Sequence, residues 1–301
     1  ERLILTMDVQ KNIGEKGILS LCATPIGNLE DITLRVIRTL EETDYVVAED
    51  TRRTLKLLNH LGISKPLLSY HKFSDEEREE RIISLLETGH NIALVSDAGM
   101  PGISDPGERL VRLAHDRNIP VTLLPGATAG LSALVLSGLP SGRFVFEGFL
   151  PANKKARREV LEELRDEERT VILYEAPHRL LKTLNQLYEV LGNREIAVVR
   201  ELTKIHEEVL SFSLKEGIKY FNSTLPKGEF VLIIKGKEKA QGSETVDEAS
   251  IAPLILEYME MGLSKKEAIK RVAADFDIAR NRIYKFGINI AIGDKNNKKR
   301  R

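Results

Sequence analysis

The sequence predicts an α/β protein: two α/β domains with a cleft between them, followed by a small helical domain. Two observations support this prediction. Short apolar runs alternate with amphipathic segments twice along the chain, and a polar linker then leads into a basic, helix-rich end. Strands that alternate with helices favour a mostly parallel sheet covered by helices. The chain has 301 residues and is 42% hydrophobic, which is enough for two or three cores.

The first predicted domain covers residues 18–139, after an N-terminal extension of residues 1–17. Its expected strands are residues 18–21, 45–48, 92–95 and 121–124. One expected helix spans residues 31–40. Another begins at Ser74, which forms an S-x-x-E capping box with Glu77 before an apolar helical pattern.

The composition breaks at residues 139–142, and a second α/β domain is expected over residues 140–236. Its predicted strands are residues 144–146, 170–174, 196–199 and 230–234, and its predicted helices are residues 154–165 and 178–191. Two α/β halves of similar size favour a ligand site between them.

A polar linker is expected at residues 237–247, a helical domain at 248–290 and a basic, disordered tail at 291–301. The predicted helices are 251–261, one opened by the capping box of Ser264 and Glu267, and 278–286. The net charge of the chain is zero, yet residues 264–301 hold twelve Lys and Arg against four Asp and Glu. This asymmetry is typical of a nucleic-acid contact confined to one end of a protein.

The loop at residues 96–107 follows a predicted buried strand and precedes a helical pattern. Open α/β sheets bind ligands at this end of their strands. Its glycines allow the backbone to approach a ligand closely, and its prolines fix the path of the loop. Asp97 and Asp105 offer hydrogen-bond acceptors for hydroxyl or amino groups. We therefore interpret it as a ligand loop.

Several classes of protein are disfavoured. No G-x-G-x-x-G follows the first strand, so a conventional dinucleotide site lacks its phosphate turn. No cluster of His and Cys has zinc spacing, and no metal is expected. The single cysteine, Cys22, is expected to be a buried hydrophobe, which suits a reducing cytoplasm. Neither a secretory signal nor a membrane span is expected.

An ordered series of motifs resembles the tetrapyrrole-methylase-type S-adenosylmethionine (SAM) methyltransferases. The segments at residues 24–33 and 48–52 are most similar to the branch that methylates the ribose 2′-hydroxyl of a cytidine in 16S ribosomal RNA. The resemblance continues through residues 96–107, 124–126, 147–151, 174–180, 200–204 and 227–229. It covers residues 18–235, and the C-terminal helices also match that branch.

The resemblance implies that SAM binds in the cleft and that the protein is a homodimer. The residues that it assigns to cofactor binding are Pro25, Asp97, Ala98, Gly99, Ser104, Ala127, Thr128, Leu202, Thr203 and Gly228. The sequence departs from related small-molecule enzymes at Asn28, where those enzymes have Asp.

Methyl transfer to a hydroxyl needs a group that accepts a proton. The predicted catalytic residues are Glu49, Asp50, Glu175 and Lys204, the last only if its pKa is lowered. Asp50 and Lys204 are the first candidates for the base. The predicted RNA-binding residues are Arg52, Arg200, Lys227, Lys265, Lys266, Lys270, Arg271, Arg280, Arg282 and Lys285.

Three functions stay open at this point. The leading prediction is a SAM-dependent methyltransferase that acts on 16S ribosomal RNA or the small ribosomal subunit. A methylase of a tetrapyrrole or another small molecule is the second, although it would not need the basic end of the chain. A catalytically silent RNA-binding protein is the third, and the carboxylate-bearing motifs disfavour it.

Overall fold

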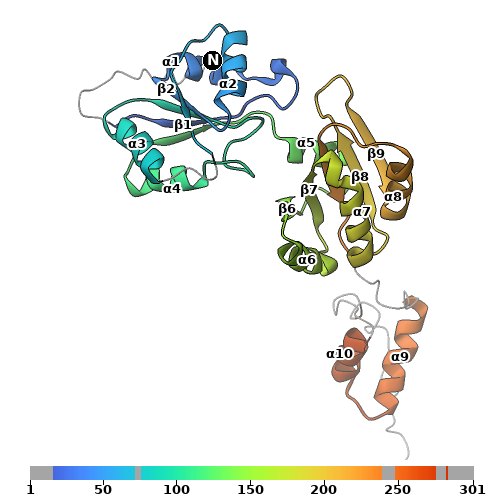
Figure 1. The fold of residues 1–301 in the computed structure, drawn as a ribbon. Coiled ribbons are helices and arrows are strands. Elements are labelled where there is room, and N and C mark those ends of the chain that lie inside the picture. The colour runs from blue at the N-terminus through green and yellow to red at the C-terminus, as the bar shows by residue number, and fades with distance from the viewer. Residues whose placement is uncertain (1–15, 72–75, 239–247, 276–282, 284–301) are drawn as a thin grey trace, which may run out of the picture. The chain divides into compact units, whose positions relative to one another are not determined.

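The structure is a computed structural model that describes residues 16–71, 76–238, 248–275 and 283 (Figure 1). The chain divides into two compact units, an N-terminal unit of Glu1–Lys237 and a C-terminal unit of Glu238–Arg301. The N-terminal unit contains two five-stranded sheets.

The first sheet is wholly parallel and has the strand order β3-β2-β4-β1-β5. Its strands are β1 (Leu19–Cys22), β2 (Tyr45–Ala48), β3 (Leu67–Ser69), β4 (Ile92–Val95) and β5 (Val121–Leu124). The helices along this part of the chain are α1 (Leu34–Glu42), α2 (Thr51–His60), α3 (Glu76–Glu87) and α4 (Glu108–Asp116), with a 3-10 turn, η1 (Leu29–Asp31), before α1.

Successive side chains of the central strands enter two different cores. Leu94 packs in a core with residues of α3 and α4, whereas Ala93 and Val95 pack in a core with residues of α1 and α2. Helices therefore cover both faces of this sheet, which explains why β1 and β4 are buried throughout. All strands point the same way, so the loops that follow them gather at one edge.

The second sheet is mixed and has the strand order β6-β7-β10-β8-β9. Its strands are β6 (Phe144–Phe149), β7 (Thr170–Glu175), β8 (Glu195–Arg200), β9 (Glu208–Ser213) and β10 (Phe230–Ile234). Only β6 and β7 are parallel, and the other neighbours are antiparallel.

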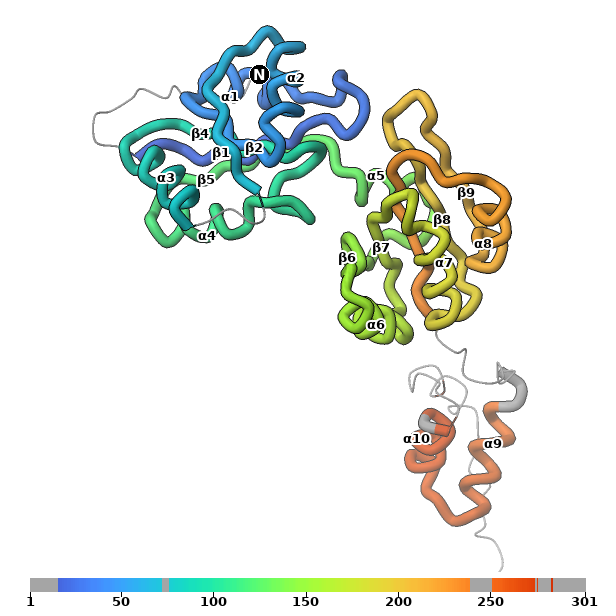
Figure 2. The backbone as a smooth tube through the Cα atoms, in the orientation of Figure 1, coloured from blue at the N-terminus to red at the C-terminus, as the bar shows by residue number. Residues whose placement is uncertain are grey.

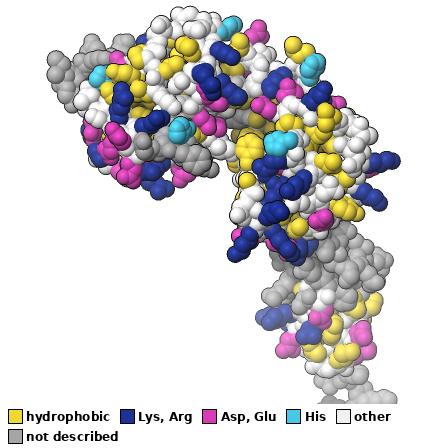
Figure 3. All heavy atoms as spheres, in the orientation of Figure 1, with side chains coloured by type: hydrophobic (Ala, Val, Ile, Leu, Met, Phe, Trp, Pro, Cys, Tyr) yellow, Lys and Arg dark blue, Asp and Glu magenta, His cyan; other side chains and the backbone are white. Residues whose placement is uncertain are grey.

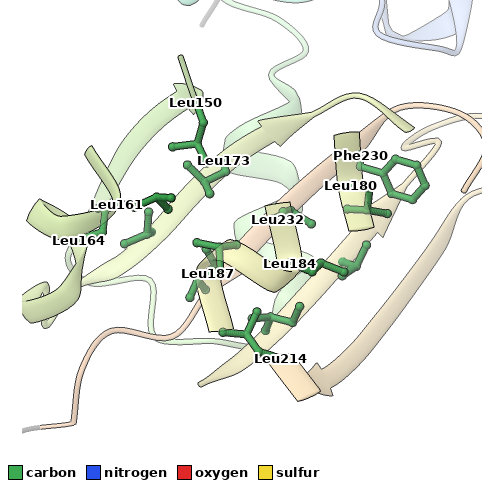
Figure 4. Packing of buried hydrophobic residues seen from close by; sticks show 14 of the residues in the cluster. Leu150, Leu161, Leu164, Leu173, Leu180, Leu184, Leu187, Leu214, Phe230 and Leu232 are labelled. Carbon is green, nitrogen blue, oxygen red and sulfur yellow. The ribbon is translucent and has the colours of Figure 1, made fainter. Parts of the chain in front are cut away.

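A leucine-rich core lies between this sheet and the helices on one of its faces (Figure 4). The helices are α6 (Lys154–Glu163), α7 (Pro177–Leu191) and α8 (Leu214–Ser223), and a short 3-10 turn, η2 (Leu164–Asp166), follows α6. Leu180, Leu184 and Leu187 recur on one face of α7 and are fully buried. This spacing is what directs one stripe of the helix toward the sheet.

Helix α5 (Ala129–Ser137) covers the other face of the second sheet. Its buried Ala133 and Leu134 pack with Ile172 of β7 and Ile233 of β10. Figure 2 shows the chain leaving β5 and entering α5 beside the strands of the second sheet. The sequence boundary at 139/140 groups α5 with the first sheet, whereas its packing joins it to the second.

The C-terminal unit contains α9 (Glu248–Glu260) and α10 (Lys265–Asp275), which pack through a small apolar core. The predicted capping box before α10 is present, because the Glu267 carboxylate accepts from the Ser264 backbone N–H at 3.0 Å and the Glu267 N–H donates to Ser264 Oγ at 3.3 Å. Of the predicted helix at 278–286, only Ile283 is described, and it is buried in this core.

Apart from the helix at 278–286, the predicted strands and helices are found within a few residues of their expected bounds. The described residues also contain five strands and α-helices that were not predicted, namely β3, β9, α2, α5 and α8. A capping box formed by Ser213 and Glu216 begins α8. This S-x-x-E pattern could have predicted the start of the helix from the sequence. Ser74, in the capping box expected earlier in the chain, lies outside the described residues.

Candidate active site

Three loops meet at the carboxyl edge of the first sheet. Thr24 after β1 and Gly99 after β4 form a two-way backbone bridge, with N···O distances of 2.9 and 3.0 Å. A Cβ atom on Gly99 would lie 3.6 Å from the carbonyl oxygen of Ala127, which follows β5. The predicted cofactor residues Pro25, Asp97, Ala98, Gly99 and Ala127 are thereby placed next to one another, and Thr128 begins α5 beside them.

The second sheet reaches these loops through the turn after β8. A Cβ atom on Gly27 would lie 2.8 Å from the carbonyl oxygen of Leu202 and 2.5 Å from Cγ of Lys204. The Gly27 backbone therefore lies directly against this turn, at a position where only glycine fits. Gly27 was not among the residues predicted from the sequence to form the site, although it stands inside the 24–33 motif.

Two predicted cofactor residues have a left-handed backbone that is unusual for their type. Thr203 has φ +65°, and its buried Oγ1 has no hydrogen-bond partner among the described residues. Ser104 has φ +63°, and its Oγ would lie 2.7 Å from a Cβ on Gly148 of β6. Such strain gathers at functional sites, and an unsatisfied buried hydroxyl is costly unless a ligand pairs with it.

Asp50 holds the start of α2 and is a weak base. It is the N-cap residue, and its Oδ1 accepts from the Arg52 backbone at 2.9 Å. The side chain of Arg52 also binds its carboxylate at 2.9 Å. Hydrogen bonds from Arg52 lower the pKa of Asp50 to about 2. Its own backbone N–H donates to Asp97 at 3.0 Å, which ties the loops after β2 and β4 together.

Two other carboxyl groups at this edge are stronger bases. Burial, followed by the neighbouring Asp97 carboxylate, raises the pKa of Glu49 above its ordinary value. Burial, with Glu49 and Asp97 close by, raises the pKa of Asp105 to about 7. From the sequence, Asp105 was predicted only to accept a hydrogen bond. Its raised pKa could not be predicted, because it depends on burial and on residues such as Glu49 that are distant in the chain.

Lys204 is held between two carboxylates. Its Nζ lies 2.9 Å from Glu201 and 3.0 Å from Glu229. Burial alone would lower the pKa of Lys204, but the hydrogen bonds to these two carboxylates raise it above its ordinary value. The lowered pKa that a lysine base would need is therefore not found, and Lys204 carries a positive charge.

Glu175 lies inside the second domain in a network of buried groups. It is 3% exposed, and Arg157 and Arg179 lie 3.7 and 3.3 Å from its carboxylate. Thr183 donates a short hydrogen bond to the same carboxylate. These contacts favour a role in fixing α6 and α7 to the end of β7.

The predicted RNA-binding residues are distributed over both units. Arg52 is exposed but paired with Asp50, and Arg200 binds Glu208 at 3.2 Å and the carbonyl oxygen of Lys227 at 2.8 Å. In the C-terminal unit, Lys266, Lys270 and Arg271 are exposed on α10, and Lys265 is half-buried at its start. Arg280, Arg282 and Lys285 lie outside the described residues.

Two negative findings apply to the described residues alone. No group of three or more His, Cys, Asp or Glu side chains among them is arranged to hold a metal ion. Within the same ranges, every helix is too short or too polar to cross a membrane.

Comparison with known proteins identifies the fold. The profile of the Tetrapyrrole (Corrin/Porphyrin) Methylases matches residues 19–217. A uroporphyrin-III-C-methyltransferase from Thermus thermophilus superposes with a TM-score of 0.53 at 20% identity, covering 73% of this chain and 94% of that one. A diphthine synthase gives 0.57 at 16% identity, covering 73% and 90%. The fold and the loops at its sheet edge define a methylase of the tetrapyrrole methylase class.

Curated relatives narrow the class further. Proteins named ribosomal RNA small subunit methyltransferase I are 48% identical in Halalkalibacterium halodurans and 45% identical in Bacillus subtilis, each over 90% of this chain and 94% of the relative. The Thermotoga maritima protein of that name is 46% identical and aligns in full with only 74% of this chain. The chain belongs to the ribosomal RNA small subunit methyltransferase I family.

The pKa of Asp105 leads to a prediction about stability. Because its pKa is raised from an unfolded value of about 3.9, the folded protein keeps a proton that the unfolded chain has lost. The free energy of unfolding should therefore fall as the pH rises from about 4 to about 7. Asp105→Asn should remove this component and gain stability relative to wild type more at about pH 8 than at about pH 5.

Urea unfolding at the two pH values measures this difference. Asp116→Asn, at an exposed position on α4, serves as the control and should show no such pH-dependent gain. An equal effect of Asp105→Asn at both pH values would contradict the prediction.

Proposed function

We propose that this chain transfers a methyl group from SAM to the ribose 2′-hydroxyl of a cytidine in 16S ribosomal RNA. The observation that carries the proposal is the identity of 48% over 90% of the chain to a relative named for small-subunit ribosomal RNA methylation. That alignment covers 272 residues, whereas the methylase profile matches residues 19–217. The similarity to this relative therefore extends beyond the segment that the methylase profile matches. Such a substrate implies work in the cytoplasm, where ribosomal subunits are assembled.

The residues of the site fit SAM. Gly27, Gly99 and Gly228 let neighbouring residues approach the backbone closely, and the Oγ1 of Thr203, which has no partner among the described residues, offers a hydroxyl for a polar group. Leu202 adds an apolar edge suited to an adenine ring. When bound, SAM would supply a methyl group on a positively charged sulfur.

Glu49 is the group that accepts the proton lost by the ribose hydroxyl. It follows β2 directly, at the edge where the cofactor loops meet, and its raised pKa makes it a stronger base than Asp50. Asp50 instead fixes the start of α2 and, through Asp97, the loop after β4. Lys204 carries the charge that holds an RNA phosphate or orients the site.

The basic C-terminal unit adds affinity for the ribosomal substrate. Its exposed cations on α10 suit phosphate contacts, and the unit has a core of its own. The Thermotoga maritima relative aligns in full with 222 residues of this chain, a length that the two α/β domains alone would provide.

The active form is a homodimer. Helix α5 contains no charged residue, and although one face packs on the second sheet, Leu131 and Val135 on it are 50% and 75% exposed. A helix that is apolar all round is normally covered on both sides. A second copy of the chain is the partner that would cover it.

The first prediction tests the reaction. Tritium from labelled SAM should enter small ribosomal subunits and not a free tetrapyrrole. Glu49→Gln should lower kcat by ~100- to 10,000-fold without changing SAM affinity, because it removes only the proton acceptor. Asp50→Asn should cost far less, since Asn caps a helix equally well.

Filter binding and calorimetry give the two readouts. Glu189→Gln, on the exposed face of α7, is the control and should retain full activity. If label enters the tetrapyrrole, the proposed substrate is wrong; if Asp50→Asn is the more damaging change, Asp50 is the base.

A second prediction concerns the C-terminal unit. A chain ending at Lys237 should fold and bind SAM, because the N-terminal unit holds both sheets with their cores. Its KM for small subunits should rise, while kcat at saturation should change little. A KM equal to that of the full chain would remove this unit from substrate binding.

The third prediction concerns the dimer. Val135→Lys places a charge in the proposed interface and should convert the dimer to a monomer in sedimentation equilibrium. Leu225→Lys is a matched control, because Leu225 is 76% exposed and lies outside α5. A wild-type monomer, or a dimer that survives Val135→Lys, would exclude this interface.

A further inference from the structure

Helix α6 carries an exposed cluster of positive charge at its beginning. Lys154, Lys155 and Arg158 lie in its first five residues, all exposed; we name these three the α6 basic turn. Figure 3 shows Lys and Arg side chains gathered over this part of the second α/β domain. None of the three was selected from the sequence.

The order of charges along α6 is the reverse of the one that stabilises a helix. The first turn contains no acid, and the acids Glu159, Glu162 and Glu163 come later. The dipole of a helix favours acids at its start and bases at its end. The α6 basic turn is therefore not explained by the stability of the helix.

The cations of the α6 basic turn are weakly paired. Lys155 and Arg158 each lie 3.9 Å from a glutamate one turn later, and no partner is found for Lys154 within the described ranges. A base placed before its acid is also the weaker order for such pairs. These charges are therefore available to an outside anion.

The helix is held rigidly with these cations outward. Arg157, between them in sequence, is 5% exposed and binds Thr183 and Gln186 of α7. The loop before α6 is fixed by Arg179, whose Nη2 donates to the carbonyl oxygen of Leu150 at 2.7 Å. A fixed array of cations suits a polyanion of regular spacing.

An exposed aromatic ring lies close by in the chain. Phe149, the last residue of β6, is 55% exposed and is five residues before Lys154. Its ring packs edge-on against Tyr174 at 5.5 Å. Burial raises the pKa of Tyr174, a hydrogen bond from Gly130 lowers it, and the carboxylate of Asp105 raises it again. Tyr174 is therefore in contact with Phe149 and near enough to Asp105, a residue of the candidate site, for that carboxylate to raise its pKa.

We propose that the α6 basic turn and Phe149 form an RNA-binding surface in the second α/β domain, where the cations bind phosphates and Phe149 stacks on an unpaired base. The inference rests on the proposed function, because it names contacts to the same RNA substrate. Exposed cations near an exposed aromatic ring are typical of surfaces that bind single-stranded nucleic acid.

The first test removes two charges from the full-length protein. Lys154→Gln with Lys155→Gln should weaken binding to transcribed 16S ribosomal RNA, and the salt dependence should become shallower by about 0.7–0.9 per lost contact. The control is Lys215→Gln with Lys219→Gln on α8, which removes the same charge from another exposed helix of this domain. An unchanged slope in the α6 variant, or an equal change in the control, would overturn the cation contacts.

The second test addresses the ring. Phe149→Leu keeps an apolar side chain against Tyr174 but loses base stacking, and should weaken RNA binding by about 5- to 150-fold. KM for the RNA should rise, whereas SAM affinity should not change. A change of oligomeric state with unchanged RNA affinity would assign Phe149 to a protein interface and overturn its stacking role.

Measurements on the wild-type protein distinguish failure of the proposed RNA-binding surface from failure of the proposed function. If it methylates 16S ribosomal RNA while the α6 and Phe149 variants behave as wild type, this surface is wrong and the proposed function stands. If the wild-type protein methylates neither that RNA nor small ribosomal subunits, both are wrong.

Discussion

The close approach of Gly27 to the turn after β8 is the constraint on which the site depends. A side chain at Gly27 would collide with the carbonyl oxygen of Leu202 and with the side chains of Thr203 and Lys204, so the loop after β1 can approach this turn only because residue 27 has no side chain. Thr203, which has a left-handed backbone and a buried hydroxyl, lies in this contact. Strain and an unpaired polar atom are tolerated there because the surrounding loops are fixed by strands on either side.

The electrostatics of the site separate carboxylates that look equivalent in the sequence. Glu49, Asp50 and Glu175 all lie at strand ends, yet their neighbours differ. Asp50 is held by Arg52, and Glu175 by the buried Arg157 and the half-buried Arg179, whereas Glu49 has the carboxylates of Asp97 and Asp50 nearby. The hydrogen bonds from Arg52 lower the pKa of Asp50, whereas burial and the neighbouring Asp97 carboxylate raise the pKa of Glu49. The environment therefore assigns different roles to the same chemical group.

The sequence predicted the alternation of strands and helices well, because buried strands such as β4 and β10 are continuous apolar runs. It did not indicate β3 or β9, whose partly exposed residues lack such runs. The motif loops could be located, and the structure brings them together. The raised pKa of Asp105 and the packing of α5 against the second sheet could not be predicted from the sequence, since both depend on residues far away in the chain.

The packing of α5 limits how this protein could be divided. The helix precedes every strand of the second sheet in the chain, yet its Ala133 and Leu134 complete that sheet's core. A fragment that began after α5 would expose the apolar face of Ile172 and Ile233 to water. The two α/β domains are therefore not interchangeable modules. During synthesis on the ribosome, α5 emerges first and must wait for the strands that it covers.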